Sequence, residues 1–337
     1  MSTKQQTKSY QLYVGVDIAA KTFTIWWHDV PRVLTFTQSP DDFAAVCRQL
    51  AATGIRSDQI LIVMEATGTY WIALAVALEA AGFCVSVINP AHIHNYVRSL
   101  PRRAKTDALD AQLIAQFAQE RRPPTWTPPP AIYHELRQRL TARDALLEAR
   151  KQLRNQQHAL AQWPVQVESV HTHLERAIAE LDTQIDEIET ELAHLAANGA
   201  WAASFTLLES IPGVGLITAA WLVVLTLNFS GWASVATLVA YAGLAPFQRE
   251  SGTSVQGRPA IGGGNARLRT ALYMATLSAA QHNPQIHTFY KRLRDKGKPM
   301  KVARCAAARK LLELAFAVVT KRQGYDPTYG VIPNSGK

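Results

Sequence analysis

Two kinds of hydrophobic pattern alternate over the first 122 residues. Five short apolar runs, rich in β-branched and aromatic residues, each predict a β-strand. They are residues 11–17, 22–27, 33–37, 59–65 and 83–88. Segments with helical periodicity lie between the last three of these runs and after the fifth. They cover residues 39–52, 70–81, 90–100 and 106–121. The predicted order is therefore three strands, a helix, a strand, a helix, a strand and further helices.

This order is typical of the RNase H-like fold, in which an antiparallel meander precedes parallel strands with crossover helices. A Rossmann-type α/β domain is the alternative, but it requires a glycine-rich loop after the first strand. Residues 17–21, Asp-Ile-Ala-Ala-Lys, contain no glycine. We therefore predict an α/β domain of the RNase H or RuvC type over residues 10–122. The proline-rich segment 123–130 predicts a stiff linker after it.

The next segment, residues 131–198, is helical in pattern and is interrupted at Trp163-Pro164. Apolar residues in its second half alternate at spacings of four and three, which is a heptad seam. They are Leu174, Ile178, Leu181, Ile185, Ile188, Leu192 and Leu195. We predict a coiled-coil spacer made of two long helices. The pattern is equally compatible with an antiparallel hairpin within one chain and with pairing against a second protomer.

Residues 201–323 are predicted to form a compact, mainly helical and basic domain. Between Arg249 and Arg322 the chain carries 15 Lys and Arg against three acidic residues, a net charge of +12, whereas the whole chain carries +9. Charge concentrated in this way indicates a polyanionic partner, DNA or RNA.

Cysteine content and hydropathy exclude several other classes of protein. Three widely spaced cysteines offer neither a disulfide framework nor a zinc ligand set. No run approaches the roughly 20 apolar residues that cross a bilayer. We therefore expect a cytoplasmic protein with no membrane partner.

Four acidic residues predict a metal site. Asp17 and Glu65 each close an apolar run, and Asp107 and Asp110 lie three apart at the start of a predicted helix. Like charges on adjacent helical turns are unfavourable unless a cation lies between them. Mg²⁺ prefers oxygen ligands, and two metal ions can stabilise the attacking and leaving oxygens of a phosphodiester. Asp107 and Asp110 could instead complement a helix N-terminus, although this alternative does not explain Asp17 and Glu65.

A glycine-containing turn within residues 207–220 predicts a helix-hairpin-helix. Its centre is Ile-Pro-Gly-Val-Gly, with Gly213 and Gly215. Glycines let a turn approach a phosphate closely, and the N–H groups opening the next helix then bind the anion. An ordinary glycine-containing helix turn is the alternative.

Residues 249–258 form a segment of small residues that we expect to be a loop. Ser251 lies in it between Glu250 and Gly252, and taken alone it is an ordinary turn serine. The segment leads through three consecutive glycines into a predicted helix. Four basic residues in and after it are candidate phosphate ligands. They are Arg249, Arg258, Arg267 and Arg269.

Taken together, these motifs resemble the DEDD-type insertion-sequence transposases. These are relatives of the Piv/MooV DNA invertases and are known as bridge-RNA-guided recombinases. The resemblance covers about residues 10–325 and rests on motifs that occur in the family's order. They are Asp17, Glu65-Ala-Thr-Gly-Thr-Tyr70, Lys105-Thr-Asp107-Ala-Leu-Asp110, Ile211-Pro-Gly-Val-Gly215, Glu250-Ser251-Gly-Thr-Ser254, Arg267-Leu-Arg269-Thr-Ala-Leu-Tyr-Met274, His282-Asn-Pro284 and Phe289-Tyr-Lys-Arg-Leu293.

The resemblance implies a RuvC-like domain, a coiled-coil spacer and a C-terminal transposase domain. It implies that Asp17, Glu65, Asp107 and Asp110 hold Mg²⁺ and that Ser251 is a nucleophile that forms a covalent phosphoserine with DNA. It also implies a structured guide RNA and a homo-oligomer, dimer or tetramer, in which the active site is composed between protomers.

Three hypotheses follow for the function. The first is an RNA-guided DNA recombinase that excises and inserts a mobile element. The second is a metal-dependent DNA endonuclease, such as a junction resolvase, in which water is the nucleophile and Ser251 is structural. The third is a non-catalytic DNA-binding protein that retains the fold.

Overall fold

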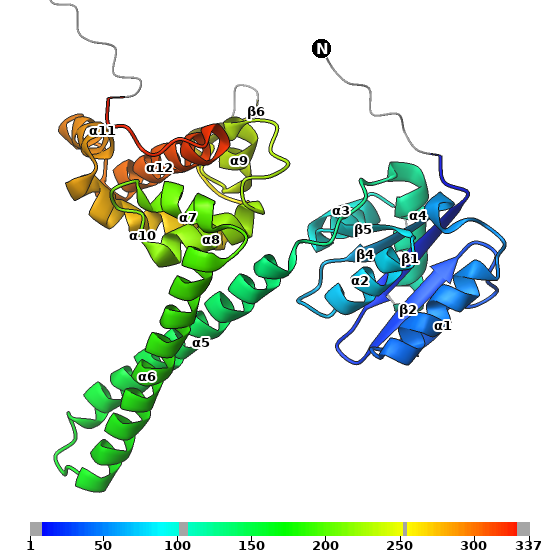
Figure 1. The fold of residues 1–337 in the computed structure, drawn as a ribbon, viewed down its shortest axis with the longest axis horizontal. Coiled ribbons are helices and arrows are strands. Elements are labelled where there is room, and N and C mark those ends of the chain that lie inside the picture. Colours follow the sequence, from blue (N-terminus) through cyan, green and yellow to red (C-terminus); the bar gives the residue numbers. More distant parts are fainter. Residues whose placement is uncertain (1–8, 101–106, 252–254, 329–337) are drawn as a thin grey trace, which may run out of the picture. The chain divides into compact units, whose positions relative to one another are not determined.

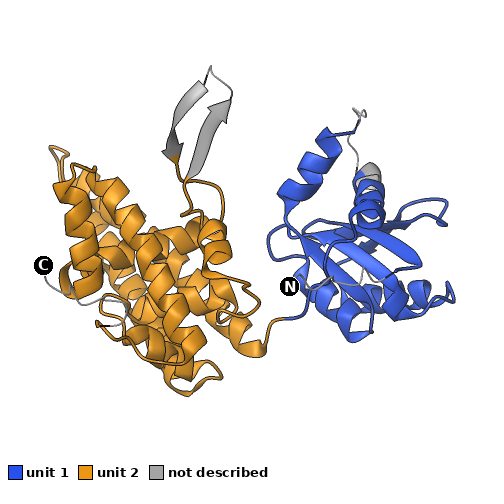
Figure 2. Ribbon diagram, turned by 90° about the horizontal axis from the view of Figure 1, so that it is seen from above, with its two compact units in different colours: residues 1–128 blue, residues 129–337 orange. Residues whose placement is uncertain are grey.

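A computed structural model describes residues 9–100, 107–251 and 255–328. The side chains of residues 107–109, 247–251 and 255–259 lie outside that description. The chain divides into two compact units, residues 1–128 and 129–337 (Figure 2). Each unit has a hydrophobic core of its own.

The N-terminal unit is built on a five-stranded sheet of order β3-β2-β1-β4-β5 (Figure 1). The strands are β1 (Leu12–Ile18), β2 (Thr22–Trp27), β3 (Leu34–Thr37), β4 (Ile60–Glu65) and β5 (Cys84–Ile88). β1, β2 and β3 form an antiparallel meander, and β4 and β5 continue the sheet parallel to β1. All five strands lie within one residue of their predicted bounds. The antiparallel meander excludes the all-parallel Rossmann-type sheet.

Helices cover both faces of this sheet. They are α1 (Pro40–Ala51), α2 (Ile72–Ala80), α3 (Pro90–Arg98) and α4 (Asp107–Arg121), with the short 3-10 helix η1 (Ser57–Gln59) before β4. On one face Val14 and Val16 of β1 share a core with side chains of α1 and α2. On the other, Leu61 and Val63 of β4 share a core with side chains of α3 and α4. The central strands are therefore apolar on both sides, as expected for a covered sheet.

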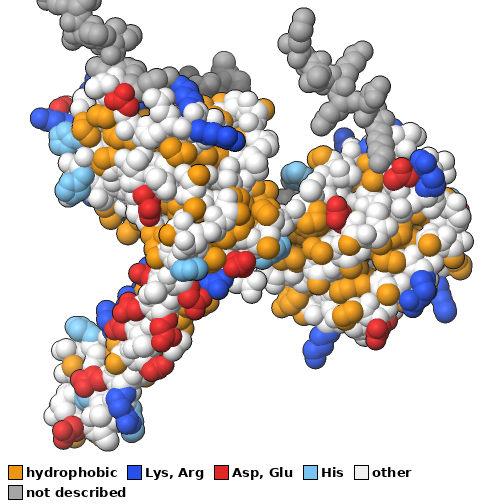
Figure 3. Space-filling model, in the orientation of Figure 1, with side chains coloured by type: hydrophobic (Ala, Val, Ile, Leu, Met, Phe, Trp, Pro, Cys, Tyr) orange, Lys and Arg blue, Asp and Glu red, His pale blue; other side chains and the backbone are white. Residues whose placement is uncertain are grey.

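Two long antiparallel helices, α5 (Ala131–Leu160) and α6 (Glu168–Asn198), open the C-terminal unit and form an arm. The predicted seam is used within one chain, since Ile178, Ile185 and Leu192 are all buried. Ion pairs tie the two helices along their length, and charges of both signs line the arm (Figure 3). They are Arg139–Glu191 at 2.6 Å, Arg143–Glu189 at 2.6 Å, Arg150–Asp182, and Arg154–Asp182 at 3.1 Å. The two helices therefore form an antiparallel hairpin within the chain, and pairing of the arm with a second protomer stays a prediction.

Six further helices follow in the described part of the unit. They are α7 (Ala202–Glu209), α8 (Leu216–Thr226), α9 (Val235–Tyr241), α10 (Ala266–His282), α11 (Pro284–Asp295) and α12 (Met300–Lys321). Their core includes Ile132, Leu136 and Leu192, so the base of the arm is packed into the helical domain. None of the helices in the described part of the chain is long and apolar enough to cross a membrane.

The segment expected to be a loop at residues 249–258 is different in the structure. It belongs to an antiparallel hairpin of β6 (Phe247–Ser251) and β7 (Val255–Ala260). The two strands form a sheet of their own, and their polar and glycine-containing sequence lacks the alternation that identifies a half-buried strand.

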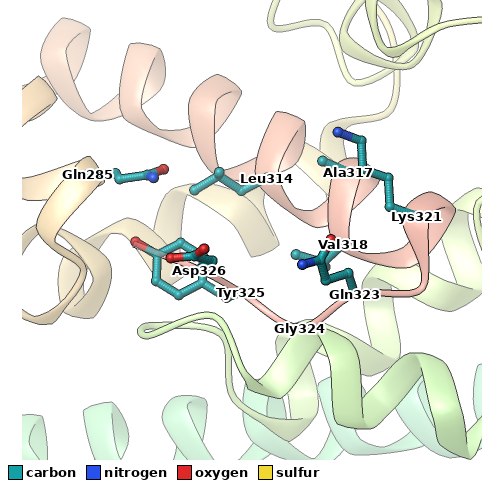
Figure 4. Close-up of a pocket in the computed structure, with 9 residues that line it drawn as sticks. All are labelled: Gln285, Leu314, Ala317, Val318, Lys321, Gln323, Gly324, Tyr325 and Asp326. Atoms are coloured by element: carbon teal, nitrogen blue, oxygen red, sulfur yellow. The ribbon is translucent and has the colours of Figure 1, made fainter. Parts of the chain in front are cut away.

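The end of the described chain is docked on the helical domain. The Tyr325 hydroxyl donates to Oδ1 of Asn283 at 2.9 Å, and the Tyr325 N–H donates to Oγ of Ser210 at 2.8 Å. The amide of Gln285 donates to the carbonyl of Pro327. Tyr325 and Gln285 thereby line a small pocket beside α12 (Figure 4).

Candidate functional site

Asp17 and Glu65 lie at the same end of two neighbouring strands. β1 and β4 pair in parallel with Val16 opposite Met64, so the two acidic residues follow in register. Successive side chains on a strand point to opposite faces. Val16 and Met64 belong to the core beneath α1 and α2. Asp17 and Glu65 therefore share the face of the sheet that α3 and α4 cover.

Helix α4 is brought close to this face by Gly15. A Cβ atom at position 15 would lie 2.0 Å from the carbonyl oxygen of Ala111 and 2.4 Å from the nitrogen of Ala115. Only glycine, which has no Cβ atom, fits that contact, so the helix packs directly on the backbone of β1. The contact lies two residues before Asp17, and Asp110 immediately precedes Ala111.

The direction of α4 orients its acidic end toward Asp17. The second half of the helix, with Gln116 and Gln119, lines a cavity together with Gln11 and Tyr13 at the start of β1. The helix consequently runs against the strand, and its first turns lie toward the end of β1 that carries Asp17. Backbone geometry thus brings Asp17, Glu65, Asp110 and the first residue of α4, Asp107, to one end of the sheet.

A divalent cation suits this set of donors chemically. All four are carboxylates, the ligands that hard cations prefer. Where the structure describes side chains, no three His, Cys, Asp or Glu residues form a metal-binding group. The side chain of Asp107 lies outside that description. The backbone therefore supplies a shared location for the carboxylates, and their chemistry fits a metal ion.

Ser251 is the last residue of β6, and its backbone pairs with that of Val255 in β7. Arg249 lies on β6 and Arg258 on β7. The side chains of these three residues are outside the described part of the structure. The strands of the hairpin are joined to the helical domain at Leu244, which is buried in the core, and at Ile261, which packs against it.

Comparison with known proteins identifies the family. Residues 14–162 match the transposase model for the DEDD domain of IS110, and residues 205–291 match the transposase IS116/IS110/IS902 family. The chain is 33% identical to the pilin gene-inverting protein of Moraxella bovis over 325 residues, which is 93% of this chain and 97% of that protein. The chain belongs to the IS110 transposase family.

Two further relatives support the assignment of the chain to this transposase family. The pilin gene-inverting protein of Moraxella lacunata is 33% identical over 318 residues, 93% of this chain and 97% of that protein. An uncharacterized 43.6 kDa protein of insertion element IS110 from Streptomyces coelicolor is 36% identical over 119 residues, 35% of this chain and 29% of its own length. Membership implies an enzyme that binds and cleaves DNA, and the DEDD-type domain indicates use of a divalent metal ion.

The two glycines between α7 and α8 of the transposase have different environments. Gly213 has a φ of +99°, and a Cβ atom there would lie 2.5 Å from the Cα of Ala279 in α10. It is therefore required for the turn and for helix packing. Gly215 is the N-cap of α8 with an ordinary φ of −98°, and no atom lies within 4 Å of the position of its Cβ. Of the pair, Gly215 is the one that leaves space for a phosphate.

The guanidinium of Arg267 is held by contacts within the transposase. It lies 2.7 Å from Oδ2 of Asp144 and 4.2 Å from the centre of the Trp221 ring. Burial lowers the pKa of Arg267 and raises that of Asp144, in each case against the opposing attraction of the partner. The pair therefore links α5 to α10 at a cost in desolvation.

Arg269 is also engaged internally. It donates to the carbonyl oxygens of Ala242 at 3.1 Å and Gly263 at 2.8 Å, and so fastens the segment before α10 to the end of α9. The nucleic-acid contacts expected of Arg267 and Arg269 stay predictions, and the structure adds an architectural role for each.

Sequence reasoning missed five basic residues that line one groove beside the hairpin. They are Arg292, Lys298, Lys301, Arg309 and Lys310. A signal for part of this set was present, because Lys301 and Arg309 are eight residues apart in a helical segment and so share a face. It was hidden within the total charge of the domain.

Proposed function

We propose that this transposase cuts and rejoins DNA through a phosphoserine formed on Ser251, and that Asp17, Glu65, Asp107 and Asp110 hold Mg²⁺ at the reacting phosphate. The observation that carries the proposal is the in-register placement of Asp17 and Glu65 beneath the acidic end of α4. Repulsion between carboxylates gathered at one end of a sheet is relieved by a cation.

The N-terminal unit is proposed to be an RNase H/RuvC-like domain. Its antiparallel meander followed by two parallel strands, and its helices on both faces, support this assignment. Metal ions bound there would stabilise negative charge on the attacking and leaving oxygens of the phosphodiester. The carboxylates of the chain would hold the ions, and the covered sheet fixes the backbone of the strands that carry Asp17 and Glu65.

Ser251 is proposed to attack the phosphorus atom with its Oγ. The Oγ–P bond forms as the Oγ proton passes to solvent or a nearby base. The bond from phosphorus to the 3′ oxygen breaks, and that leaving oxygen takes a proton from solvent or a nearby acid. In rejoining, a 3′ hydroxyl attacks the phosphoserine and the serine oxygen is released and reprotonated. The number of phosphodiester-type bonds is conserved, so the exchange needs no nucleotide cofactor.

Recombination is favoured over simple hydrolysis by the pilin gene-inverting proteins. Inverting a gene requires that each cut end be joined again, whereas a nuclease that uses water releases the ends. The likeness to these proteins extends over 93% of this chain. We extend the same chemistry to excision and insertion of a mobile element.

DNA and a structured noncoding guide RNA are the proposed partners. The excess of positive charge after Arg249 suits both, since phosphate contacts supply much of the affinity for any nucleic acid. The turn between α7 and α8 is proposed to act as a helix-hairpin-helix, with the open backbone at Gly215 facing a phosphate. Such contacts position the strand without reading its sequence.

Trapping the covalent intermediate tests this function. The protein, the RNA transcribed from the DNA beside its gene, and end-labelled element DNA are incubated with Mg²⁺, denatured and separated by electrophoresis. We expect labelled DNA attached to the wild type and to Ser254→Ala, and none attached to Ser251→Ala. Omitting the RNA should abolish the adduct.

The outcomes separate the hypotheses for the enzyme. Equal cleavage by wild type and Ser251→Ala, with no adduct in either, would establish the water-dependent endonuclease instead. Asp17→Ala should abolish cleavage while DNA binding persists, and full cleavage by this variant would overturn the metal site. DNA binding without cleavage by any form, under all metal and RNA conditions, would favour the non-catalytic protein.

A further inference from the structure

An open groove of about 1080 Å³ lies beside the foot of the β6–β7 hairpin. It is lined by Leu244 and Pro246 before β6, by Ala260 at the end of β7 and by Ile261 after it. The remaining lining residues come from α11, from the turn that follows it and from α12. Small-ligand pockets measure about 300–1,000 Å³ and bury most of the surface of the ligand, whereas this groove is open and can accommodate a segment of a polymer.

The rim of the groove is strongly basic. Five Lys and Arg line it against one acidic residue, Glu313, so that its formal charge is +4. Glu313 is already paired with Arg309 at 3.1 Å and Lys310 at 3.8 Å. Arg292, Lys298 and Lys301 are exposed, and among the described residues none of the three forms an ion pair. Their charge is thus available to a polyanion.

The position of Lys298 is set by the turn between α11 and α12. Arg294 donates to the carbonyl of Lys298 at 2.6 Å, and Gly297 adopts a φ of +73°. The turn is fastened in this way, and Lys298 within it and Lys301 at the start of α12 both line the groove.

The floor of the groove is apolar, in contrast to its rim. Phe289, Val302, Cys305 and Ala306 line it, and Val302 is 53% exposed. The guanidinium of Arg292 lies 5.2 Å from the centre of the Phe289 ring. Unpaired bases offer flat apolar surfaces that pack on aromatic and aliphatic side chains, whereas a duplex keeps its bases stacked inside. Charge at the rim with an apolar floor therefore matches a single strand.

We infer that this groove binds a short stretch of single-stranded DNA, with phosphates against Arg292, Lys298 and Lys301 and bases against Phe289 and Val302. The choice of DNA rests on the proposed function, because strand β6 ends at Ser251 and the groove lies at the foot of that hairpin. The groove would hold the strand whose phosphate Ser251 attacks.

Binding is tested in the full-length Ser251→Ala background, so that no cleavage intervenes. The probe is a fluorescent oligothymidylate, and affinity is measured by anisotropy as a function of salt. Replacing Arg292, Lys298 and Lys301 together by Gln should lower the slope of log K against log salt by about 2, since each phosphate contact on a single strand contributes about 0.7. The matched control replaces Lys291, Lys296 and Arg304 by Gln. These residues carry the same charge in the same segment but do not line the groove.

Cys305 reports occupancy of the groove itself. It lines the floor, while the other two cysteines, Cys47 and Cys84, belong to the N-terminal unit and serve as internal references. Burial raises the pKa of the Cys305 thiol, so alkylation is carried out at mildly alkaline pH and followed by peptide mass spectrometry. Oligothymidylate should slow alkylation of Cys305 at least about threefold in the control variant and leave it unchanged in the groove variant.

Several results would overturn the inference. Alkylation of Cys305 at the same rate with and without saturating oligothymidylate would show that the strand binds elsewhere. Equal protection by a DNA duplex would remove the role of the apolar floor, and stronger protection by oligouridylate would make RNA the occupant. Failure of the proposed chemistry is distinguishable, because it removes the Ser251 adduct and leaves protection of Cys305 intact.

Discussion

The two units of this transposase place charge in opposite ways. In the N-terminal unit, strand register and the contact at Gly15 gather like charges at one end of a sheet. In the C-terminal unit, positive charge is spread over several helices, and part of it, at Arg267 and Arg269, is used to hold the fold together. The proposed metal site depends on carboxylates held by a rigid scaffold, whereas phosphate contacts require only an accessible face.

Mixing two inactive variants tests whether these two kinds of site work together across protomers. Asp17→Ala and Ser251→Ala are each expected to be inactive alone. If the functional form is a homo-oligomer with a shared site, mixed oligomers combine Asp17 of one protomer with Ser251 of another and regain covalent DNA cleavage. The measurement is the labelled adduct after co-expression. Absence of any adduct in verified mixed oligomers would place both residues of a site in one chain.

Gly15→Ala should cause the next largest effect. The added Cβ would meet the backbone of Ala111 and Ala115, which cannot rotate away, so α4 must shift from β1. We expect a loss of about 1–3 kcal/mol in the free energy of unfolding, together with loss of cleavage as Asp110 moves from Asp17. Urea denaturation measures the first and adduct formation the second. Gly215→Ala, where a Cβ meets nothing within 4 Å, is the matched control and should change stability by less than about 0.5 kcal/mol.

Arg267→Leu distinguishes an internal from an external role for an arginine of the basic domain. The substitution removes the contact with the Trp221 ring and leaves Asp144 without its partner on α10. We expect a loss of about 1–3 kcal/mol in unfolding free energy because the pair is only partly buried, with the salt dependence of DNA binding unchanged. If the slope of log K for DNA binding against log salt fell by about 0.9 and stability did not change, Arg267 would instead be a phosphate contact.

The smallest expected effect is a dependence of the local stability of the arm on pH. A hydrogen bond from Arg150, with the charges of Arg150 and Arg154, holds the pKa of Asp182 below its usual value. Its contribution to stability is therefore present above the ordinary aspartate pKa of about 3.9 and is lost as pH falls through the lowered value. Hydrogen exchange of α6 amides, corrected for intrinsic rates, should show a protection difference between wild type and Asp182→Asn at neutral pH that disappears in acid. A difference that persists below this range would contradict the assignment.

The sequence predicted the N-terminal unit closely because its strands are strongly patterned. Each of the five apolar runs is long enough and rich enough in β-branched residues to specify a strand, and Asp17 and Glu65 mark the ends of two of them. Their convergence could be anticipated from parallel pairing alone. The role of Gly15 could not, since it depends on a helix almost 100 residues further along the chain.

The C-terminal unit was less predictable because its important contacts join distant residues. The partner of Arg267 is Asp144, 123 residues earlier, and Gly213 is required by Ala279 rather than by its own turn alone. The β6–β7 hairpin, whose first strand ends at Ser251, carries few apolar residues, so its hydrophobic pattern suggested a loop. The total charge of the domain indicated a nucleic-acid partner, but it did not identify which Lys and Arg side chains remain available at the groove.

The arm formed by α5 and α6 also has a mechanical consequence. A helix of 30 residues is about 45 Å long, and its base is fixed by Ile132, Leu136 and Leu140 in the core of the helical domain. A tilt of only about 5° at that base would carry the tip through about 4 Å. Packing at the base of the arm, by these side chains and by Leu192 of α6, thus sets the position of a tip far from the core.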